Sequence, residues 1–117
     1  MPDPAAGLSS LCGVARWCYG AAAVSVATVD DDGLRYVAAA GEGADGIVGT
    51  LLEPGRGIAG FVAATGQSLT VRDVTTDPRF ARDVSERTGY VPTELQCIAV
   101  HDADGEVVAV MSLLDRD

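Results

Sequence analysis

The apolar positions near the start of the chain recur at intervals of three and four residues, which is the spacing of one helix face. The pattern predicts a helix from about Pro4 to Tyr19, and Gly20 ends it because glycine readily takes the left-handed conformation after a helix. The apolar stripe consists of Leu8, Leu11, Cys12, Ala15 and Cys18. We expect Cys12 to lie in the core.

After this helix, apolar and polar residues alternate in short runs that predict β-strands. Residues 21–29 pair with 34–40, and residues 95–102 pair with 106–114, each pair joined by an Asp-Gly turn typical of hairpins. A shorter strand is expected at residues 68–72. The sequence therefore predicts an α+β fold, with a central five- or six-stranded antiparallel sheet flanked by helices.

The first strand has small side chains on one of its two faces. Its residues alternate between Ala23, Ser25 and Ala27 on one side and Val24, Val26 and Thr28 on the other. Small side chains leave space above that face of the sheet. Either a ligand occupies this space, or helices approach closely and fill it with Phe and Leu, because apolar pockets and apolar cores have similar sequences.

Residues 52–80, LEPGRGIAGFVAATGQSLTVRDVTTDPRF, contain the strongest local signals. Apolar residues at helical spacing predict a short helix over 58–65, and Gly66 is placed to end it. Asp77 is expected to cap a second helix with Pro78 in its first turn, where the missing proline N–H costs nothing. Charges four residues apart, such as Arg82 and Glu86, then predict a solvated outer face.

The same segment contains Gly55, Gly57 and Gly60 in the order G-x-G-x-x-G, which also occurs in dinucleotide-binding domains. That motif needs a strand immediately before it and a full crossover helix after it. Here Pro54 precedes the glycines, and Gly66 limits the helix to about eight residues. Both features argue against dinucleotide binding.

The complete series GRGIAG-x-VAATGQ, V-x-DV, TDPRF and TGYVP resembles the GAF domain family of small-molecule sensor and regulatory domains, which are similar to PAS domains. The resemblance covers most of the chain, from the helix near Leu8 to the last strand near Leu113. It implies a single domain of bacterial origin over residues 1–117, with the N-terminal helix at 1–19 and the sheet with its inserted short helices at 21–114.

The resemblance also implies where a ligand would bind. In the family, the ligand lies between the sheet and the short helices of the central region. The corresponding candidate pocket residues here are Phe61, Val71, Phe80, Tyr90, Cys97 and Ala99. The ligand itself is not identified by the sequence, and no cofactor is evident from it.

The chain departs from the family pattern at its end, because the usual C-terminal helix is apparently missing after residues 115–117. We expect either a fragment of a longer regulator or a short form that stands alone. In both cases the N-terminal helix, with Trp17 and Tyr19 near its end, is the candidate surface for a homodimer. The alternative is that these two aromatic side chains pack in the core.

Composition excludes several functions. Among the 117 residues there are eight Lys and Arg against 17 Asp and Glu, a net charge of −9, and all eight basic residues are Arg. Such a chain has no basic stripe for direct nucleic-acid binding, and without Lys it has neither a Schiff-base residue nor a P-loop Lys. No signal peptide or membrane-spanning run is recognisable, so we expect a cytoplasmic protein without a membrane partner.

Three cysteines, Cys12, Cys18 and Cys97, fit neither a disulfide framework nor a zinc pattern. One branch of GAF-like proteins uses cysteines to reduce free methionine sulfoxide, but its cysteines lie in loops around the pocket, whereas two of these lie in the N-terminal helix. His101, the only histidine, is placed near a turn and is expected at the surface rather than as a haem ligand. We expect no metal site and no catalytic residue.

These observations predict a non-catalytic sensory or regulatory module that binds a small molecule, within a signal-transduction or transcription-regulating protein. The main alternative is a dimerisation or scaffold domain without a ligand. Free methionine-(R)-sulfoxide reduction is the less favoured enzymatic alternative.

Overall fold

Helix α1 (Pro4–Tyr19) begins the described part of the chain, since this computed structural model describes residues 4–116. The bounds agree with the apolar pattern, and Gly20 follows the helix with a left-handed φ of 62°. Cys12 is buried at the centre of the helix face that packs on the sheet, as expected. Leu8 and Ala15 pack beside it.

Six strands form one antiparallel sheet in the order β3-β2-β1-β6-β5-β4. They are β1 (Ala21–Asp30), β2 (Gly33–Gly41), β3 (Leu51–Leu52), β4 (Leu69–Val71), β5 (Leu95–His101) and β6 (Val107–Arg116). The two expected hairpins, β1–β2 and β5–β6, meet in the middle of the sheet because β1 pairs with β6. The α+β fold is confirmed, and the two-residue β3 is the sixth strand.

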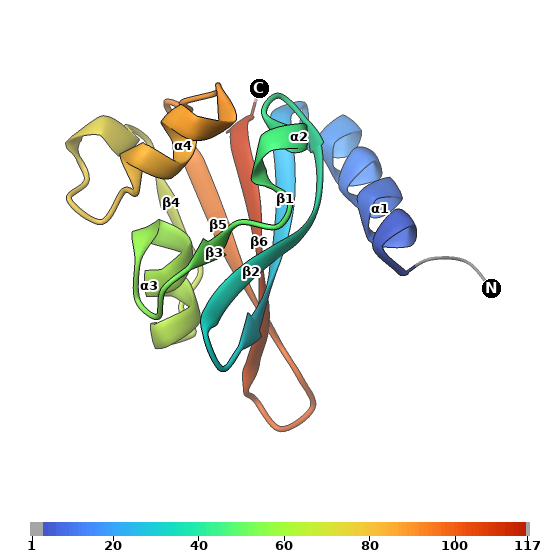
Figure 1. Ribbon diagram of the computed structural model, residues 1–117, viewed down its shortest axis with the longest axis vertical. Coiled ribbons are helices and arrows are strands. Elements are labelled where there is room, and N and C mark those ends of the chain that lie inside the picture. The colour runs from blue at the N-terminus through green and yellow to red at the C-terminus, as the bar shows by residue number, and fades with distance from the viewer. Residues whose placement is uncertain (1–3, 117) are drawn as a thin grey trace.

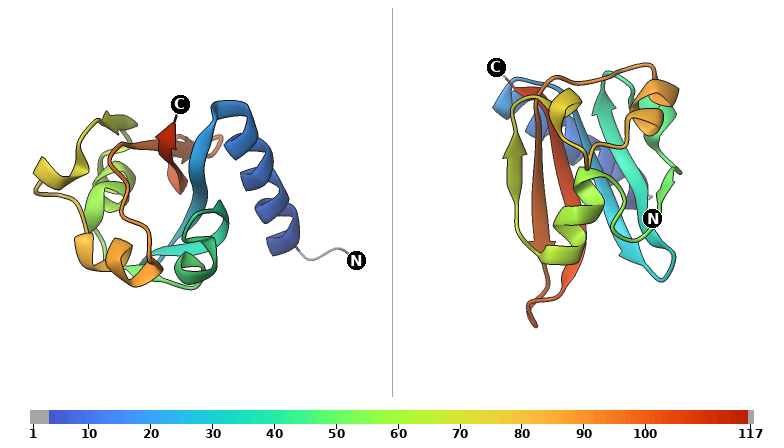
Figure 2. Two further views of the ribbon diagram at one scale, coloured as in Figure 1. Left: turned by 90° about the horizontal axis from the view of Figure 1, so that it is seen from above. Right: turned by 90° about the vertical axis from the view of Figure 1, so that its left-hand side faces the viewer.

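Short helices occupy the segment between the hairpins. They are α2 (Ala44–Ile47), α3 (Gly57–Thr65), the 3-10 helix η1 (Val74–Thr76) and α4 (Arg82–Thr88). Figure 1 shows α1 on one side of the sheet and the short helices on the other. In the left panel of Figure 2 the sheet curves around the short helices, while α1 lies outside the curve.

Each face of the sheet has its own apolar core. On the α1 side, Val24 and Leu113 are fully buried around Cys12. On the other side, the buried residues Ile58 and Val62 of α3 pack on the sheet beside Ala27. The alternation along β1 therefore divides its valine face from its alanine and serine face, as its sequence predicts.

The glycines of residues 55–60 shape the entry to α3. A Cβ on Gly60 would lie 2.8 Å from the carbonyl carbon of Gly55, so the first turn of the helix closes on the loop that precedes it. The helix is nine residues long and lies over an antiparallel sheet, not in a parallel βαβ unit. The G-x-G-x-x-G order is therefore a packing feature here.

The expected helix start at Asp77 and Pro78 is wrong. Helix α4 begins at Arg82, and Asp77 instead follows η1. The Asp77 carboxylate accepts hydrogen bonds from the backbone N–H of Arg79 (2.8 Å) and from its guanidinium (2.9 and 2.6 Å). The Asp side chain thus closes a local turn, an alternative to capping that the same residue type offers.

Substitution by Ala should change the free energy of unfolding in opposite directions at Gly66 and at Gly13. Gly66 has a φ of 73° at the end of α3, so Gly66→Ala should lower the free energy of unfolding by about 1 kcal/mol. Gly13 lies within α1. Apart from its chain neighbours and the backbone of its own helix, no described atom lies within 4 Å of the position that a Cβ would take, so Gly13→Ala should raise the free energy of unfolding by about 0.5–1 kcal/mol. Urea denaturation measures the change in the free energy of unfolding for each variant. If both variants are stabilised, Gly66 is not required at the end of the helix and its assignment is contradicted.

Candidate functional site

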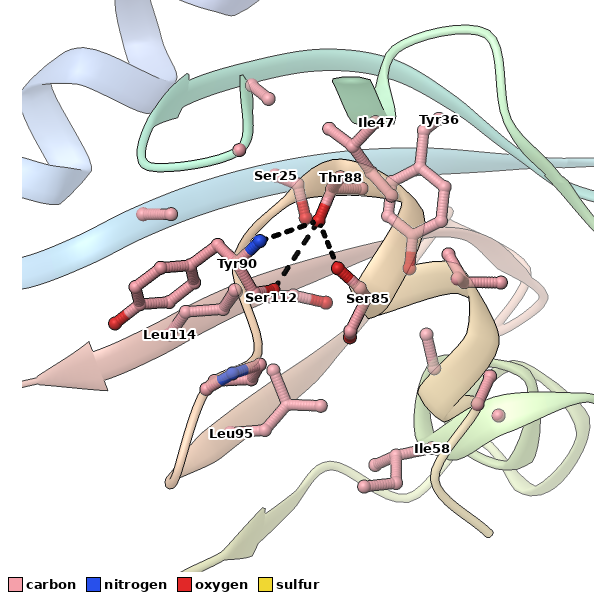
Figure 3. Close-up of a pocket in the computed structure, with 18 of the residues that line it drawn as sticks. Ser25, Tyr36, Ile47, Ile58, Ser85, Thr88, Tyr90, Leu95, Ser112 and Leu114 are labelled. Atoms are coloured by element: carbon pink, nitrogen blue, oxygen red, sulfur yellow. Dashed lines mark hydrogen bonds between the residues drawn. The ribbon is translucent and has the colours of Figure 1, made fainter. Parts of the chain in front are cut away.

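A cavity of about 80 Å³ lies between the sheet and the helices α2 and α4. Figure 3 shows side chains from both layers pointing into it. The lining is mostly apolar and includes Leu52, Ile58, Phe80, Val84, Leu95 and Leu114. Because the small residues Ala23 and Ser25 of β1 form part of its floor, the space that the strand pattern predicts is present and is not filled by Phe or Leu.

Hydroxyl groups supply the polar part of the cavity. Ser25 is 7% exposed, Tyr36 8% and Ser112 3%, and all three line the cavity. Within residues 4–116, the Ser25 and Tyr36 hydroxyls have no hydrogen-bond partner, while Ser112 Oγ lies 3.4 Å from Cys97 Sγ. These two hydroxyls border the open space of the cavity, where a polar ligand or a water molecule can supply their hydrogen bonds.

The Tyr36 hydroxyl remains protonated under ordinary conditions. Burial raises the pKa of Tyr36 far above its usual value, and the nearby Cys97 raises it further. A neutral phenol can both donate and accept one hydrogen bond. Tyr36 therefore offers a hydrogen-bonding group to the cavity without adding charge.

Thr88 and Ser85 of α4 face the cavity from the opposite side, and Thr88 already has partners. Its hydroxyl donates to the carbonyl of Ser85 (2.8 Å) and lies 3.4 Å from the backbone N of Tyr90. The dashed lines in Figure 3 mark these two contacts and a third, between the Thr88 hydroxyl and the carbonyl of Tyr90 (3.4 Å). Thr88 therefore stabilises the end of α4 and is less available to a ligand.

The rim of the cavity is acidic. Glu42 and Tyr90 both line it, and the Tyr90 hydroxyl donates a hydrogen bond to the carboxylate of Asp115. Burial raises the pKa of Tyr90 to about 12, with further contributions from this hydrogen bond and from the charges of Asp115 and Glu42. The two carboxylates thus act on the same side of the cavity.

Asp115 also holds the segment that follows Tyr90. Its carboxylate accepts the backbone N–H groups of Thr93 (2.9 Å) and Glu94 (2.8 Å), and its own N–H donates to the Glu94 carbonyl (3.0 Å). Its backbone has a φ of 51°, an unusual conformation for a residue other than glycine. One carboxylate therefore fixes the wall of the cavity that contains Tyr90 and Pro92.

Ion pairs hold the helices over the cavity. Arg56, immediately before α3, pairs with Asp83 in the first turn of α4. The Arg79 guanidinium pairs with Asp77 and lies 4.6 Å from the centre of the Phe61 ring, a cation–π contact. Because both arginine side chains are partly exposed to solvent, these pairs orient the segment more than they stabilise the fold.

The structure brings two of the six sequence-predicted pocket residues, Phe80 and Tyr90, to the cavity. Phe61 instead lies under Arg79, and Cys97 is buried behind Ser112. Val71 and Ala99 are partly buried against the core on this side of the sheet, and neither lines the cavity. Binding of a ligand by any of the six stays a prediction.

Besides Ser85 and Thr88 of α4, four polar lining residues were not predicted from the sequence: Ser25, Tyr36, Glu42 and Ser112. Ser25 had a signal, because it belongs to the small face of β1. The other three come from β2, the segment before α2, and β6, and only the strand order places them together.

The other chemistry-bearing residues lie outside the cavity. Cys18 is exposed on α1, Cys12 is buried on the opposite side of the sheet, and His101 is exposed, as expected. Within the described part of the chain, no three His, Cys, Asp or Glu side chains are grouped to hold a metal ion. Among helices of that part, none is long and apolar enough to cross a membrane.

The GAF domain model matches residues 5–117. The chain belongs to the GAF domain family. Among curated proteins, it is 32% identical over 62 residues to the dual 3',5'-cyclic-AMP and -GMP phosphodiesterase 11A of Takifugu rubripes, an alignment that covers 53% of this chain and 7% of that protein. The chain therefore spans less than a tenth of the length of this relative.

Solved structures show the same fold. The GAF domain of a phosphoenolpyruvate-protein phosphotransferase from Coxiella burnetii matches with a TM-score of 0.81 at 19% identity, over 98% of this chain and 68% of that one. The free methionine-R-sulfoxide reductase of Neisseria meningitidis, solved in complex with its substrate, matches with a TM-score of 0.77 at 22% identity, over 97% of this chain and 63% of that one. At these identities the likeness establishes the GAF fold alone.

The burial of the cysteines predicts their reactivity. Burial raises the pKa of Cys97 to about 11 and also raises that of Cys12, so neither forms thiolate readily at neutral pH. A colorimetric disulfide reagent should therefore modify one thiol per native chain rapidly at pH 7, and all three after unfolding. The variant Cys18→Ser should remove the rapid phase, and a rapid phase that persists in it would contradict these positions.

Proposed function

We propose that this GAF domain is the ligand-binding module of a regulatory protein and that it binds a small molecule in the cavity between the sheet and α2 and α4. The observation that carries the proposal is the pair of unpartnered hydroxyls, Ser25 and Tyr36, inside a mostly apolar cavity. Apolar walls with a few convergent polar groups are typical of small-molecule sites. In a scaffold domain without a ligand, water would have to supply the hydrogen bonds of these groups.

The size of the cavity limits its ligand. About 80 Å³ is well below the roughly 300–1,000 Å³ typical of sites for drug-sized ligands. In the arrangement described here, the cavity admits a molecule of a few non-hydrogen atoms. A cyclic nucleotide, the substrate named for the phosphodiesterase relative, would need α2 and α4 to move outward.

Such movement is also the proposed regulatory mechanism. A ligand that contacts both the sheet and α4 favours the arrangement in which these layers are close, and so shifts the population of conformations that a neighbouring domain or partner reads. Helix α4 is seven residues long and has one buried side chain, Val84, so it is weakly held in the absence of a ligand. The segment that moves would extend from Gly55 to Tyr90.

Binding without catalysis is the activity that the cavity supports best. The reductase relative is an enzyme, but no cysteine of this chain lines the cavity described here, and Cys97 is buried behind Ser112 with a raised pKa. A thiol nucleophile needs thiolate character and access to its substrate. Three free cysteines are consistent with a reducing compartment, and we place the protein in the cytoplasm on this basis.

Filling the cavity tests ligand binding directly. Ser25→Val removes the hydroxyl and places two methyl groups in the cavity, whereas the matched variant Ser25→Ala only removes the hydroxyl. In a thermal-shift screen of small metabolites, a ligand at a hundred times its Kd should raise the Tm of the native chain by about 10 °C. We expect a reduced shift in Ser25→Ala and none in Ser25→Val.

The Tm of each variant without ligand shows whether it folds. If no metabolite shifts the native chain, or if Ser25→Val responds as the native chain does, the scaffold alternative is the better explanation.

We also propose that α1 joins two copies of this chain. Leu11, Val14 and Trp17 follow one another at spacings of three residues and are 64%, 58% and 84% exposed. Tyr19 is 50% exposed, so the alternative that the two aromatic residues pack in the core of one chain is wrong.

From Pro4 to Tyr19 there is no Asp or Glu, and the only charged side chain, Arg16, donates to the carbonyl of Ala22. In a chain of net charge −9, a helix without carboxylates is the surface where two copies repel each other least.

Substitution of Trp17 tests this dimer. Trp17→Glu should weaken dimerisation at least about tenfold, because aromatic residues at the centre of an interface carry much of its energy and the new charges repel. Sedimentation equilibrium measures the dimer Kd. Val100→Glu, at a residue 42% exposed on β5, adds the same charge elsewhere and should leave the Kd unchanged. A native chain that is monomeric at all concentrations would contradict the proposal.

A further inference from the structure

The charge of the cavity points to one class of ligand. Of the described residues that line it, Glu42 is the one charged side chain, and no Arg or His is among them. An anionic ligand would therefore enter without a cation to pair with it. Binding sites for carboxylate and phosphate groups normally supply Arg or Lys, because an unpaired buried charge is costly.

The arginines near the cavity are engaged in other contacts or are not among its lining residues. Arg16 of α1 lies beside the backbone of residues 41–42, where its Nε donates to the Ala22 carbonyl. On α4, Arg82 pairs with Glu86, and Asp83 holds Arg56. Arg116, at the end of β6, pairs with Glu94. Arg87 of α4 is exposed and is not a lining residue. These arginines do not neutralise the rim from within the cavity.

Glu42 itself is available to a ligand. It precedes α2, it is exposed, and within residues 4–116 its carboxylate has no ion-pair or hydrogen-bond partner, although its backbone N–H donates to the Ala22 carbonyl (3.0 Å). The ring of Tyr90 lies on the same rim, and its hydroxyl is held by a second carboxylate, Asp115. A carboxylate next to an aromatic ring is a favourable environment for an ammonium group.

We propose that the ligand of this cavity is a compact amine with a hydroxyl or similar hydrogen-bonding group at its other end. The ammonium group binds at the rim against Glu42 and Tyr90, and the hydrogen-bonding group reaches the unpartnered hydroxyls of Ser25 and Tyr36. This assignment rests on the proposed function of the cavity as a ligand site and adds the charge of the ligand. It also predicts that compact anions do not bind.

Three probes of nearly the same size separate the charge classes. Ethanolamine carries an ammonium group, ethylene glycol is neutral, and glycolate is an anion, while each has a hydroxyl group. Titration of the full chain, followed by amide chemical shifts of residues around Ser25 and Tyr36, should give a Kd for ethanolamine at least tenfold lower than that for glycolate. Added salt should weaken ethanolamine binding and leave ethylene glycol binding unchanged, because salt screens an exposed ion pair.

Two variants separate the two ends of the site. Glu42→Gln should raise the Kd of ethanolamine about fivefold and leave that of ethylene glycol unchanged, since the carboxylate acts on the ammonium group alone. Ser25→Ala should weaken both probes to the same extent. Glu106→Gln, in the β5–β6 turn at the far end of the molecule from α2 and α4, removes the same charge and is the matched control (Figure 1).

The outcomes distinguish this inference from the proposed function. If glycolate binds more tightly than ethanolamine, with shifts around Ser25 that Ser25→Val abolishes, the amine assignment is overturned and the cavity remains a ligand site. If Glu42→Gln and Glu106→Gln have equal effects, the rim does not select charge and the assignment also fails. If none of the probes binds and no metabolite stabilises the chain, both the assignment and the proposed function are wrong.

Discussion

The pairing of β1 with β6 at the centre of the sheet organises both faces of the molecule. Because this pairing joins two hairpins, the small face of β1 and the Ser112 side of β6 lie next to each other under the short helices. The opposite face presents Val24 and Leu113 to α1. Alternation along a strand thus gives one sheet a tightly packed face and a face with a cavity.

The cavity persists because its cover is held from its edges. Arg56 and Asp83 connect the starts of α3 and α4, and Asp115 fixes the segment around Thr93 and Glu94. Close packing normally removes internal space, and polar groups in that space normally find partners. Here the helices stop short of the Ser25 and Tyr36 hydroxyls, and that arrangement is favourable only if a ligand or water supplies the hydrogen bonds.

Much of the fold could be predicted because its signals are local. The bounds of α1, the alternation in the four long strands and the Gly66 helix end each depend on residues close together in the sequence. The predicted stripe of α1 is confirmed only in part, because Leu8, Cys12 and Ala15 pack on the sheet whereas Leu11 and Cys18 are exposed. The start of α4 could not be placed in this way. Asp77 can cap a helix or close a turn with nearly the same hydrogen bond, and the bidentate contact of Arg79 favours the turn.

In the candidate site, too, some features follow from local sequence and others depend on tertiary contacts. Local patterns predicted that one face of β1 carries small side chains and that a short helix over residues 58–65 ends at Gly66, while the family resemblance implied a ligand site between the sheet and the short helices. Only the tertiary structure decided which polar groups meet there, because Tyr36, Glu42 and Ser112 come from distant segments that the strand order brings together. It also placed Phe61 and Cys97 outside the cavity. Alternation along a strand specifies which face of the sheet a side chain is on. Which side chains from different strands come into contact depends on the pairing of strands far apart in the sequence, and a short segment does not specify that pairing.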